Sequence, residues 1–220
     1  MNIHTIATMI DNTEISPLKT SSEMRIFIES SAESGFGGVC LTPRWISMAS
    51  EILQGSDTSV SMVVGLHVET IAMQVHAIEE GTAAGANVFD ILMPLHAVKA
   101  GEWQEVQDGV GAVVSAADDL PIRMILETDC LTDEEIRHSC QICMEAKVAF
   151  VKTSTGLNGP GARVEAVRLM YATVAGSVGV KASGGIRTYD QLLSMVDAGA
   201  SRIGTRTAWS ILEEAQQRLA

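Results

Sequence analysis

Basic residues are scarce in this chain. Its 220 residues include 15 lysines and arginines against 27 aspartates and glutamates, which gives a formal net charge of −12 at pH 7. A nucleic-acid partner needs clusters of Lys and Arg that neutralise its phosphates. The composition therefore argues against nucleic-acid binding, and it is compatible with ordinary cytoplasmic solubility.

Long apolar runs are also missing. No window holds the roughly 18 apolar residues of a membrane-spanning helix. The first residues, Met1 to His4, do not form the basic segment that leads into an apolar one in a secretory signal. We therefore expect a cytoplasmic protein without membrane contact.

Cysteine is limited to four residues, too few for a disulfide scaffold in a chain of this length. Cys140 and Cys143 form a C-x-x-C pair, but the segment 132–136 just upstream is typical of a capped helix start. Both thiols are then expected on one helical face, whereas a redox motif would open a helix and a zinc site would need two further ligands nearby. We interpret the pair as small core residues.

Short apolar runs alternate with helical patterns, as in a parallel α/β fold. The strands are expected at 8–11, 38–41, 61–66, 88–93, 122–126, 149–152, 179–181 and 202–204. Helical patterns are seen at 23–34, 71–85, 102–117, 132–146, 162–175 and 189–198. Eight such units in 220 residues favour a compact (β/α)8 TIM barrel over a doubly wound sheet, which more often has five or six strands. Nothing resembles a linker, so we expect a single domain over residues 1–220.

Two of the five lysines, Lys152 and Lys181, each end an apolar run. An ammonium at the end of a buried strand must be desolvated, so packing alone does not explain it. If the two strands are parallel neighbours, the amines converge at one end of the sheet. Mutual repulsion then lowers the pKa of one amine, and a neutral lysine can attack a carbonyl to form a Schiff base.

Other polar residues end the remaining strands, and in a barrel the chemistry belongs to these carboxyl-terminal ends. They are Asp11, Cys40, His67, Asp90 and Glu127. Glu127 could be an acid in the pocket or a structural ion-pair partner of Lys152 or Lys181, and we favour the ion pair. For His67 a structural role weighs more than a substrate contact.

The loops after the seventh and eighth strands, 183–187 and 204–207, offer backbone N–H groups and one arginine each. Barrels often bind a phosphate on these loops, so we expect an anion there.

Four segments resemble deoxyribose-phosphate aldolase, a bacterial class I aldolase, and the resemblance runs over nearly the whole length. They are Phe-Val-Lys-Thr-Ser-Thr-Gly at 150–156, Val-Lys-Ala-Ser-Gly-Gly-Ile-Arg-Thr at 180–188, Leu-Glu-Thr-Asp-Cys-Leu-Thr-Asp-Glu-Glu-Ile at 126–136 and Ile-Asp-Asn-Thr at 10–13. The resemblance implies a lyase of carbohydrate catabolism that needs no metal or other cofactor. Its reaction would be the reversible cleavage of 2-deoxy-D-ribose 5-phosphate into acetaldehyde and D-glyceraldehyde 3-phosphate through a lysine Schiff base.

Carried over position by position, the resemblance implies three catalytic residues. Lys152 would be the Schiff-base nucleophile, Lys181 the amine that lowers its pKa, and Asp90 an acidic proton relay. Asp11 would be a supporting polar residue and Cys40 a thiol in the pocket wall. The substrate-binding residues would be Asp11, Cys40, Thr155, Gly156, Gly184, Gly185, Arg187, Gly204, Arg206 and Thr207. The expected partners are small sugar-phosphate and aldehyde substrates, with a homodimer as a family-level expectation.

The departures from the family pattern concern the substrate. Arg206 and Thr207 stand where the family usually has two serines, and the loop at 65–69 differs from the usual Gly-Phe-Pro-x-Gly. An arginine there could strengthen a phosphate contact or admit a carboxylate, and both alternatives stay open. Two rivals follow: a lysine-dependent aldolase for another phosphorylated or carboxylated sugar, and a catalytically silent barrel that binds a sugar phosphate. The intact Lys152, Lys181 and Asp90 argue against the silent barrel.

Overall fold

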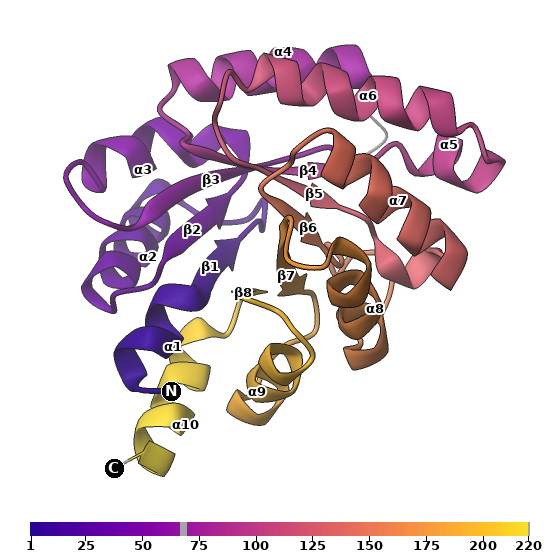
Figure 1. Cartoon of the computed structure of the whole chain (residues 1–220). Coiled ribbons are helices and arrows are strands. Elements are labelled where there is room, and N and C mark those ends of the chain that lie inside the picture. Colours follow the sequence, from indigo (N-terminus) through magenta and orange to yellow (C-terminus); the bar gives the residue numbers. More distant parts are fainter. Residues whose placement is uncertain (67–69, 220) are drawn as a thin grey trace.

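A computed structural model describes residues 1–66 and 70–219 and shows eight parallel strands closed into one barrel with helices around it (Figure 1). The strands are β1 (Ile10–Glu14), β2 (Gly38–Leu41), β3 (Ser59–Val64), β4 (Val88–Leu92), β5 (Ile122–Ile125), β6 (Phe150–Lys152), β7 (Gly179–Ser183) and β8 (Arg202–Thr205). Each strand pairs with the next along the chain, and β8 closes the barrel against β1. The predicted (β/α)8 barrel is confirmed.

The helices are α1 (Ile3–Met9), α2 (Ser21–Glu33), α3 (Ile46–Ile52), α4 (Ile71–Ala83), α5 (Leu95–Ala100), α6 (Trp103–Ala116), α7 (Asp133–Glu145), α8 (Val164–Val174), α9 (Tyr189–Asp197) and α10 (Ala208–Leu219), with the 3₁₀ turns η1 (Pro43–Trp45) and η2 (Thr128–Cys130). The six predicted helices agree with α2, α4, α6, α7, α8 and α9 to within two residues at each end. Threonine caps explain this agreement, because the hydroxyls of Thr20, Thr132 and Thr188 each accept the N–H three residues later in a capping box.

The start of the first predicted strand was wrong. Thr8 and Met9 belong to α1, which begins where the Asn2 side chain accepts a hydrogen bond from the backbone N–H of Thr5 at 2.8 Å. This N-cap satisfies a free donor at the helix start and favours helix over strand in the residues that follow. The first strand therefore begins at Ile10 and extends to Glu14.

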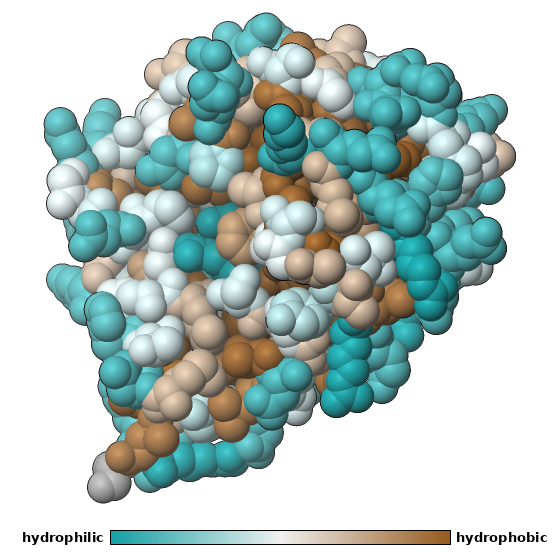
Figure 2. Space-filling model, viewed as in Figure 1, coloured by the Kyte–Doolittle hydropathy of each residue, from teal (hydrophilic) through white to brown (hydrophobic). Residues whose placement is uncertain are grey.

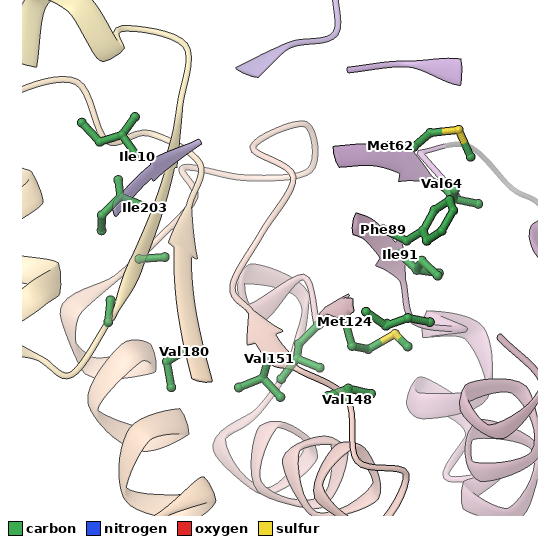
Figure 3. Close-up of a cluster of buried hydrophobic side chains, with 14 of the residues drawn as sticks. Ile10, Met62, Val64, Phe89, Ile91, Met124, Val148, Val151, Val180 and Ile203 are labelled. Carbon is green, nitrogen blue, oxygen red and sulfur yellow. The ribbon is translucent and has the colours of Figure 1, made fainter. Parts of the chain in front are cut away.

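The main apolar core lies between the strands and the surrounding helices. Figure 3 shows part of it, with labelled side chains from β1 and β3 to β8, such as Ile10, Phe89 and Val151. Cys140 and Cys143 on α7 are fully buried in this core, as predicted. Because successive residues of a strand face opposite sides, the polar residues that alternate with these apolar ones face the barrel interior. Figure 2 shows hydrophilic side chains around most of the visible rim, in keeping with the charged composition.

No helix within 1–66 and 70–219 has both the length and the hydropathy to cross a bilayer. In the same part of the chain, no group of three or more His, Cys, Asp or Glu side chains is arranged to hold a metal ion.

Candidate active site

Asp90 lies at the centre of the buried polar cluster. Its Oδ2 accepts hydrogen bonds from Lys152 Nζ at 2.6 Å and from Lys181 Nζ at 2.7 Å. The closed barrel brings these residues together. Lys152 and Lys181 are register partners on β6 and β7, while Asp90 lies on β4, which β5 separates from β6. The thiol of Cys40 lies 3.6 Å from the same oxygen, and the Ser61 hydroxyl donates to Oδ1 at 3.1 Å.

Asp11 connects this cluster to two arginines. Its Oδ2 lies 2.7 Å from Lys181 Nζ and accepts from Arg123 Nη1 at 2.8 Å. Arg202 Nη2 donates to Oδ1 at 2.7 Å. Arg123 also lies 3.5 Å from Asp90 Oδ1, so it bridges the two carboxylates. Lys181, Asp11 and Asp90 are fully buried, and each charge therefore depends on its partners for stability.

The pKa values follow from this arrangement. Burial raises the pKa of Asp90, but Lys152, Lys181 and Arg123 together lower it well below its ordinary value. Asp11 is shifted downward in the same way, since burial is outweighed by Arg123, Lys181 and Arg202. Both carboxylates are consequently ionised at neutral pH.

The two lysines shift in opposite directions. Burial lowers the pKa of Lys152, but the contact with Asp90 outweighs it and the net shift is upward. For Lys181, burial together with Arg123 and Lys152 outweighs the two carboxylates, and the pKa is lowered. The expectation that Lys181 lowers the pKa of Lys152 stays a prediction. The amine whose pKa is lowered overall is Lys181, mainly because burial disfavours its charged form, with Arg123 and Lys152 adding to the effect.

A cavity of about 380 Å³ opens above the cluster. Lys152 is the member of the cluster that lines it, with 6% of its surface exposed, while Lys181 is 0% exposed. Of the expected substrate-binding residues, eight line the cavity: Thr155, Gly156, Gly184, Gly185, Arg187, Gly204, Arg206 and Thr207. Asp11 and Cys40 do not line it and lie behind Lys152. Cys40 instead contacts Asp90 within the buried cluster, and its role toward the substrate stays a prediction.

Glycines allow the loops after β6 and β7 to meet in the cavity wall. Gly184 has φ +90°, and a Cβ added there would lie 2.9 Å from the Cα of Gly161. A Cβ on Gly161 would lie 2.3 Å from the carbonyl carbon of Gly184. The two backbones touch directly, which only glycine permits at both positions.

Known proteins were compared with this chain. The family model described as DeoC/LacD family aldolase matches residues 5–210. The chain belongs to this aldolase family. It is 41% identical to the deoxyribose-phosphate aldolase of Caldanaerobacter subterraneus subsp. tengcongensis, over 95% of this chain and 93% of that protein. It is 38% identical to the deoxyribose-phosphate aldolase of Mannheimia succiniciproducens, over 98% and 97% of the two chains. The solved deoxyribose phosphate aldolase of Aeropyrum pernix, described as tetrameric, superimposes with a TM-score of 0.90 at 26% identity, covering 100% of this chain and 94% of that one.

Two arginines of this DeoC/LacD family aldolase were missed by sequence reasoning. Arg123 and Arg202 lie near the beginnings of β5 and β8, whereas the search for site residues considered strand ends. Only the barrel register, which sets Arg123 opposite Asp90 and Arg202 opposite Lys181, brings them to the cluster. In the sequence, the signal that could have identified these arginines is a charged residue within a strand that is otherwise apolar.

Glu127 bonds the loop after β6. The expected ion pair of Glu127 with a lysine was wrong: its carboxylate accepts from the backbone and hydroxyl of Thr155 at 3.0 and 2.6 Å and from Asn158 at 3.2 Å. The chain turns at Glu127 with φ +54°, which directs the carboxylate to the β6 loop. His67 lies outside the described residues.

Proposed function

We propose that this chain is a class I aldolase that reversibly cleaves 2-deoxy-D-ribose 5-phosphate into acetaldehyde and D-glyceraldehyde 3-phosphate. The observation that carries the proposal is that the two lysines share one carboxylate but differ in their access to the cavity. Lys152 lines the cavity, Lys181 is fully buried, and both amines bond one oxygen of Asp90. The relatives named deoxyribose-phosphate aldolase support the choice of substrate.

The first step requires a neutral Lys152. Its raised pKa keeps a proton on Nζ, while the lowered pKa of Lys181 makes that amine the easier one to deprotonate. With Lys181 neutral, the proton of Lys152 can pass through Asp90 Oδ2 to Lys181. Because Lys181 is the weaker base, this form is a minor one, and the attack of neutral Lys152 on the aldehyde draws the transfer forward. Lys152 is then the nucleophile, and the positive charge has moved to the amine that does not face the cavity.

The covalent steps then follow at Lys152. Its Nζ attacks the C1 aldehyde, and loss of water gives a protonated imine. Asp90, through a water or Lys181, removes the proton of the C3 hydroxyl as the C2–C3 bond breaks. C3 then leaves as the aldehyde carbon of D-glyceraldehyde 3-phosphate, and the bonding electrons move into the imine to form an enamine. Protonation at C2 and hydrolysis release acetaldehyde and restore the free amine.

Arg187 and Arg206 are both exposed and both line the far part of the cavity with Gly184, Gly185 and Thr207. Two guanidinium groups beside backbone N–H donors suit a phosphate dianion. A second candidate uses the same observation. An arginine also binds a carboxylate in a bidentate manner, so a lysine-dependent aldolase for a carboxylated sugar fits this end of the cavity.

Paired substrates test the proposal. The purified chain should cleave 2-deoxyribose 5-phosphate, with a kcat/KM at least about a hundredfold above that for 2-deoxyribose, because a charge-assisted phosphate contact contributes several kcal/mol. Acetaldehyde with borohydride should add an ethyl group at Lys152. Cleavage of a carboxylated analogue in preference to the phosphate would favour the second candidate. An absence of both cleavage and trapping would indicate a silent barrel.

Three further points are proposals from the sequence. A single domain over residues 1–220 is supported by the closure of all eight strands into one barrel. A cytoplasmic location suits a substrate that is a phosphorylated sugar. Sedimentation of the purified chain would distinguish the proposed homodimer from a tetramer like that described for the Aeropyrum pernix relative.

A further inference from the structure

The segment after β5 holds the loop after β6 through its two carboxylates. Glu127 accepts three hydrogen bonds, from the N–H and the hydroxyl of Thr155 and from the amide of Asn158. Two residues later, Asp129 accepts from the backbone N–H of Gly161 at 2.7 Å. The loop is thus fixed near its beginning and near its end by side chains of the neighbouring strand's loop.

Glu127 is an unusual residue for a merely structural contact. Its side chain is fully buried, and no salt bridge to it occurs in the part of the chain that the structure describes. Its three hydrogen-bond donors, from Thr155 and Asn158, all belong to the β6 loop and are neutral. The backbone of Glu127, at φ +54°, is in the left-handed region, which residues other than glycine rarely adopt unless their surroundings fix them.

The β6 loop forms one wall of the cavity. Thr155, Gly156, Gly159 and Pro160 line it, and the N–H of Ala162 donates to the carbonyl of Gly184 at 2.9 Å. The position of this loop therefore sets the distance between the two walls at the end of the cavity that carries Gly184 and Gly185. Lys152, at the inner end, bonds Asp90, whereas the hydrogen bonds of Glu127 go to Thr155 and Asn158.

We propose that Glu127 is a positioning residue for the phosphorylated end of the substrate and takes no part in the chemistry at Lys152. The inference rests on the proposed function, since it requires a sugar phosphate that extends from Lys152 to the loops after β6, β7 and β8. Through Thr155 and Asn158, the carboxylate keeps the loop at the distance that a bound phosphate ester needs. Loss of this carboxylate weakens substrate binding and leaves the imine step intact.

The test compares Glu127→Gln, Asn158→Ala and the control Glu29→Gln with the unmodified chain. Glu29 is an exposed carboxylate on α2 whose contact with Arg25, at 3.8 Å, is a surface pair of little energetic weight. Its variant therefore reports mainly the loss of one negative charge. Steady-state cleavage of 2-deoxyribose 5-phosphate gives KM and kcat, and borohydride trapping with acetaldehyde gives the rate of imine formation. Acetaldehyde is too small to reach the β6 loop, so it isolates the reaction at Lys152.

We expect Glu127→Gln to raise KM about tenfold or more, because hydrogen bonds to a charged group are lost. Its kcat and its trapping rate should stay within about twofold of the unmodified chain, the pattern of lost uniform binding. Asn158→Ala, which removes one exposed donor, should raise KM by about two- to fivefold. Glu29→Gln should behave as the unmodified chain.

Two results would overturn the inference. An unchanged KM in Glu127→Gln would mean that the loop does not depend on the carboxylate. If both Glu127→Gln and Asn158→Ala lose borohydride trapping and cleavage to the same extent, the substitutions affect the stability of the barrel or the reaction at Lys152 and not the binding of the phosphorylated end. If Glu127→Gln does not fold, the KM of Asn158→Ala decides the question. Failure of the unmodified chain to cleave the substrate is a different outcome, and it would count against the proposed function itself.

Discussion

Lys152 and Lys181 stand opposite each other in the parallel register of β6 and β7, and their amines bond the same carboxylate oxygen. Their access differs, since Lys152 lines the cavity and Lys181 has no exposed surface. Their pKa values also shift in opposite directions, upward for Lys152 and downward for Lys181. In the proposed mechanism, Lys152 reacts with the aldehyde, and Lys181 exchanges a proton with Lys152.

Replacement of Lys152 by arginine should abolish the covalent reaction. A guanidinium cannot form the imine, so kcat should fall by at least about a thousandfold and borohydride trapping should stop. Lys147→Arg is the matched control, because Lys147 is exposed and lies before β6, away from the cavity. Full turnover by Lys152→Arg would refute the proposed mechanism.

Replacement of Asp90 by asparagine should affect both activity and stability. It leaves Lys152, Lys181 and Arg123 without their shared carboxylate, so we expect kcat to fall by about 10²- to 10⁴-fold and the free energy of unfolding to fall by about 3–5 kcal/mol. Urea unfolding and steady-state rates measure the two effects. Asp190→Asn is the control, since Asp190 pairs with Arg218 at the exposed surface and the loss of such a pair leaves stability nearly unchanged.

Acid should destabilise the barrel through Asp11 and Asp90. Both have folded-state pKa values below the ordinary range, so each binds protons more weakly when folded than when unfolded. Their contribution to stability is fully present above an unfolded pKa of about 3.9 and is lost as the pH falls toward the folded values. Urea unfolding between pH 7 and pH 2 should show a nearly constant free energy down to about pH 5 and a steep fall below about pH 4. A free energy that rises on acidification would contradict the charged cluster.

Alkylation should distinguish the cysteines. Burial and the charge of Asp90 raise the pKa of Cys40 to about 11, and Cys140 and Cys143 are buried in the core. Cys130 is exposed on η2. Because the thiolate is the reactive form, iodoacetamide at pH 8 should label Cys130 first and leave Cys40 unmodified on the same timescale. Peptide mass spectrometry after a short exposure measures the order, and early labelling of Cys40 would show that its thiol is accessible and ionised.

Much of the barrel could be predicted from short-range patterns. A predicted helical pattern follows each strand except the second and the eighth, and threonine caps mark the starts of α2, α7 and α9. The helix α10, with 12 residues after β8, was not predicted. The short helices α3 and α5 were not predicted, because 7 and 6 residues provide too few turns for a clear helical period. The segment at 3–9 was not assigned to a helix for the same reason, although Asn2 caps it.

The composition of the polar cluster could be predicted only in part from local sequence patterns. Lys152, Lys181 and Asp90 were identified from strand ends and from the family resemblance, and they meet as expected. The contribution of Arg123 depends on its register opposite Asp90, a relation between strands that no local pattern contains. For this reason the direction of the two lysine pKa shifts could not be obtained from the lysine motifs alone.

The contact between Gly161 and Gly184 also limits how this pocket can be redesigned. Where two main chains touch, neither loop has a side chain that can be trimmed to make room, and any bulk added to one loop displaces the other. Variants meant to accept larger or uncharged aldehydes should therefore be sought at positions 206 and 207, where side chains alone occupy the space. Positions 206 and 207, just after β8, are therefore the tolerant part of the cavity wall, and the glycine loops are the fixed part.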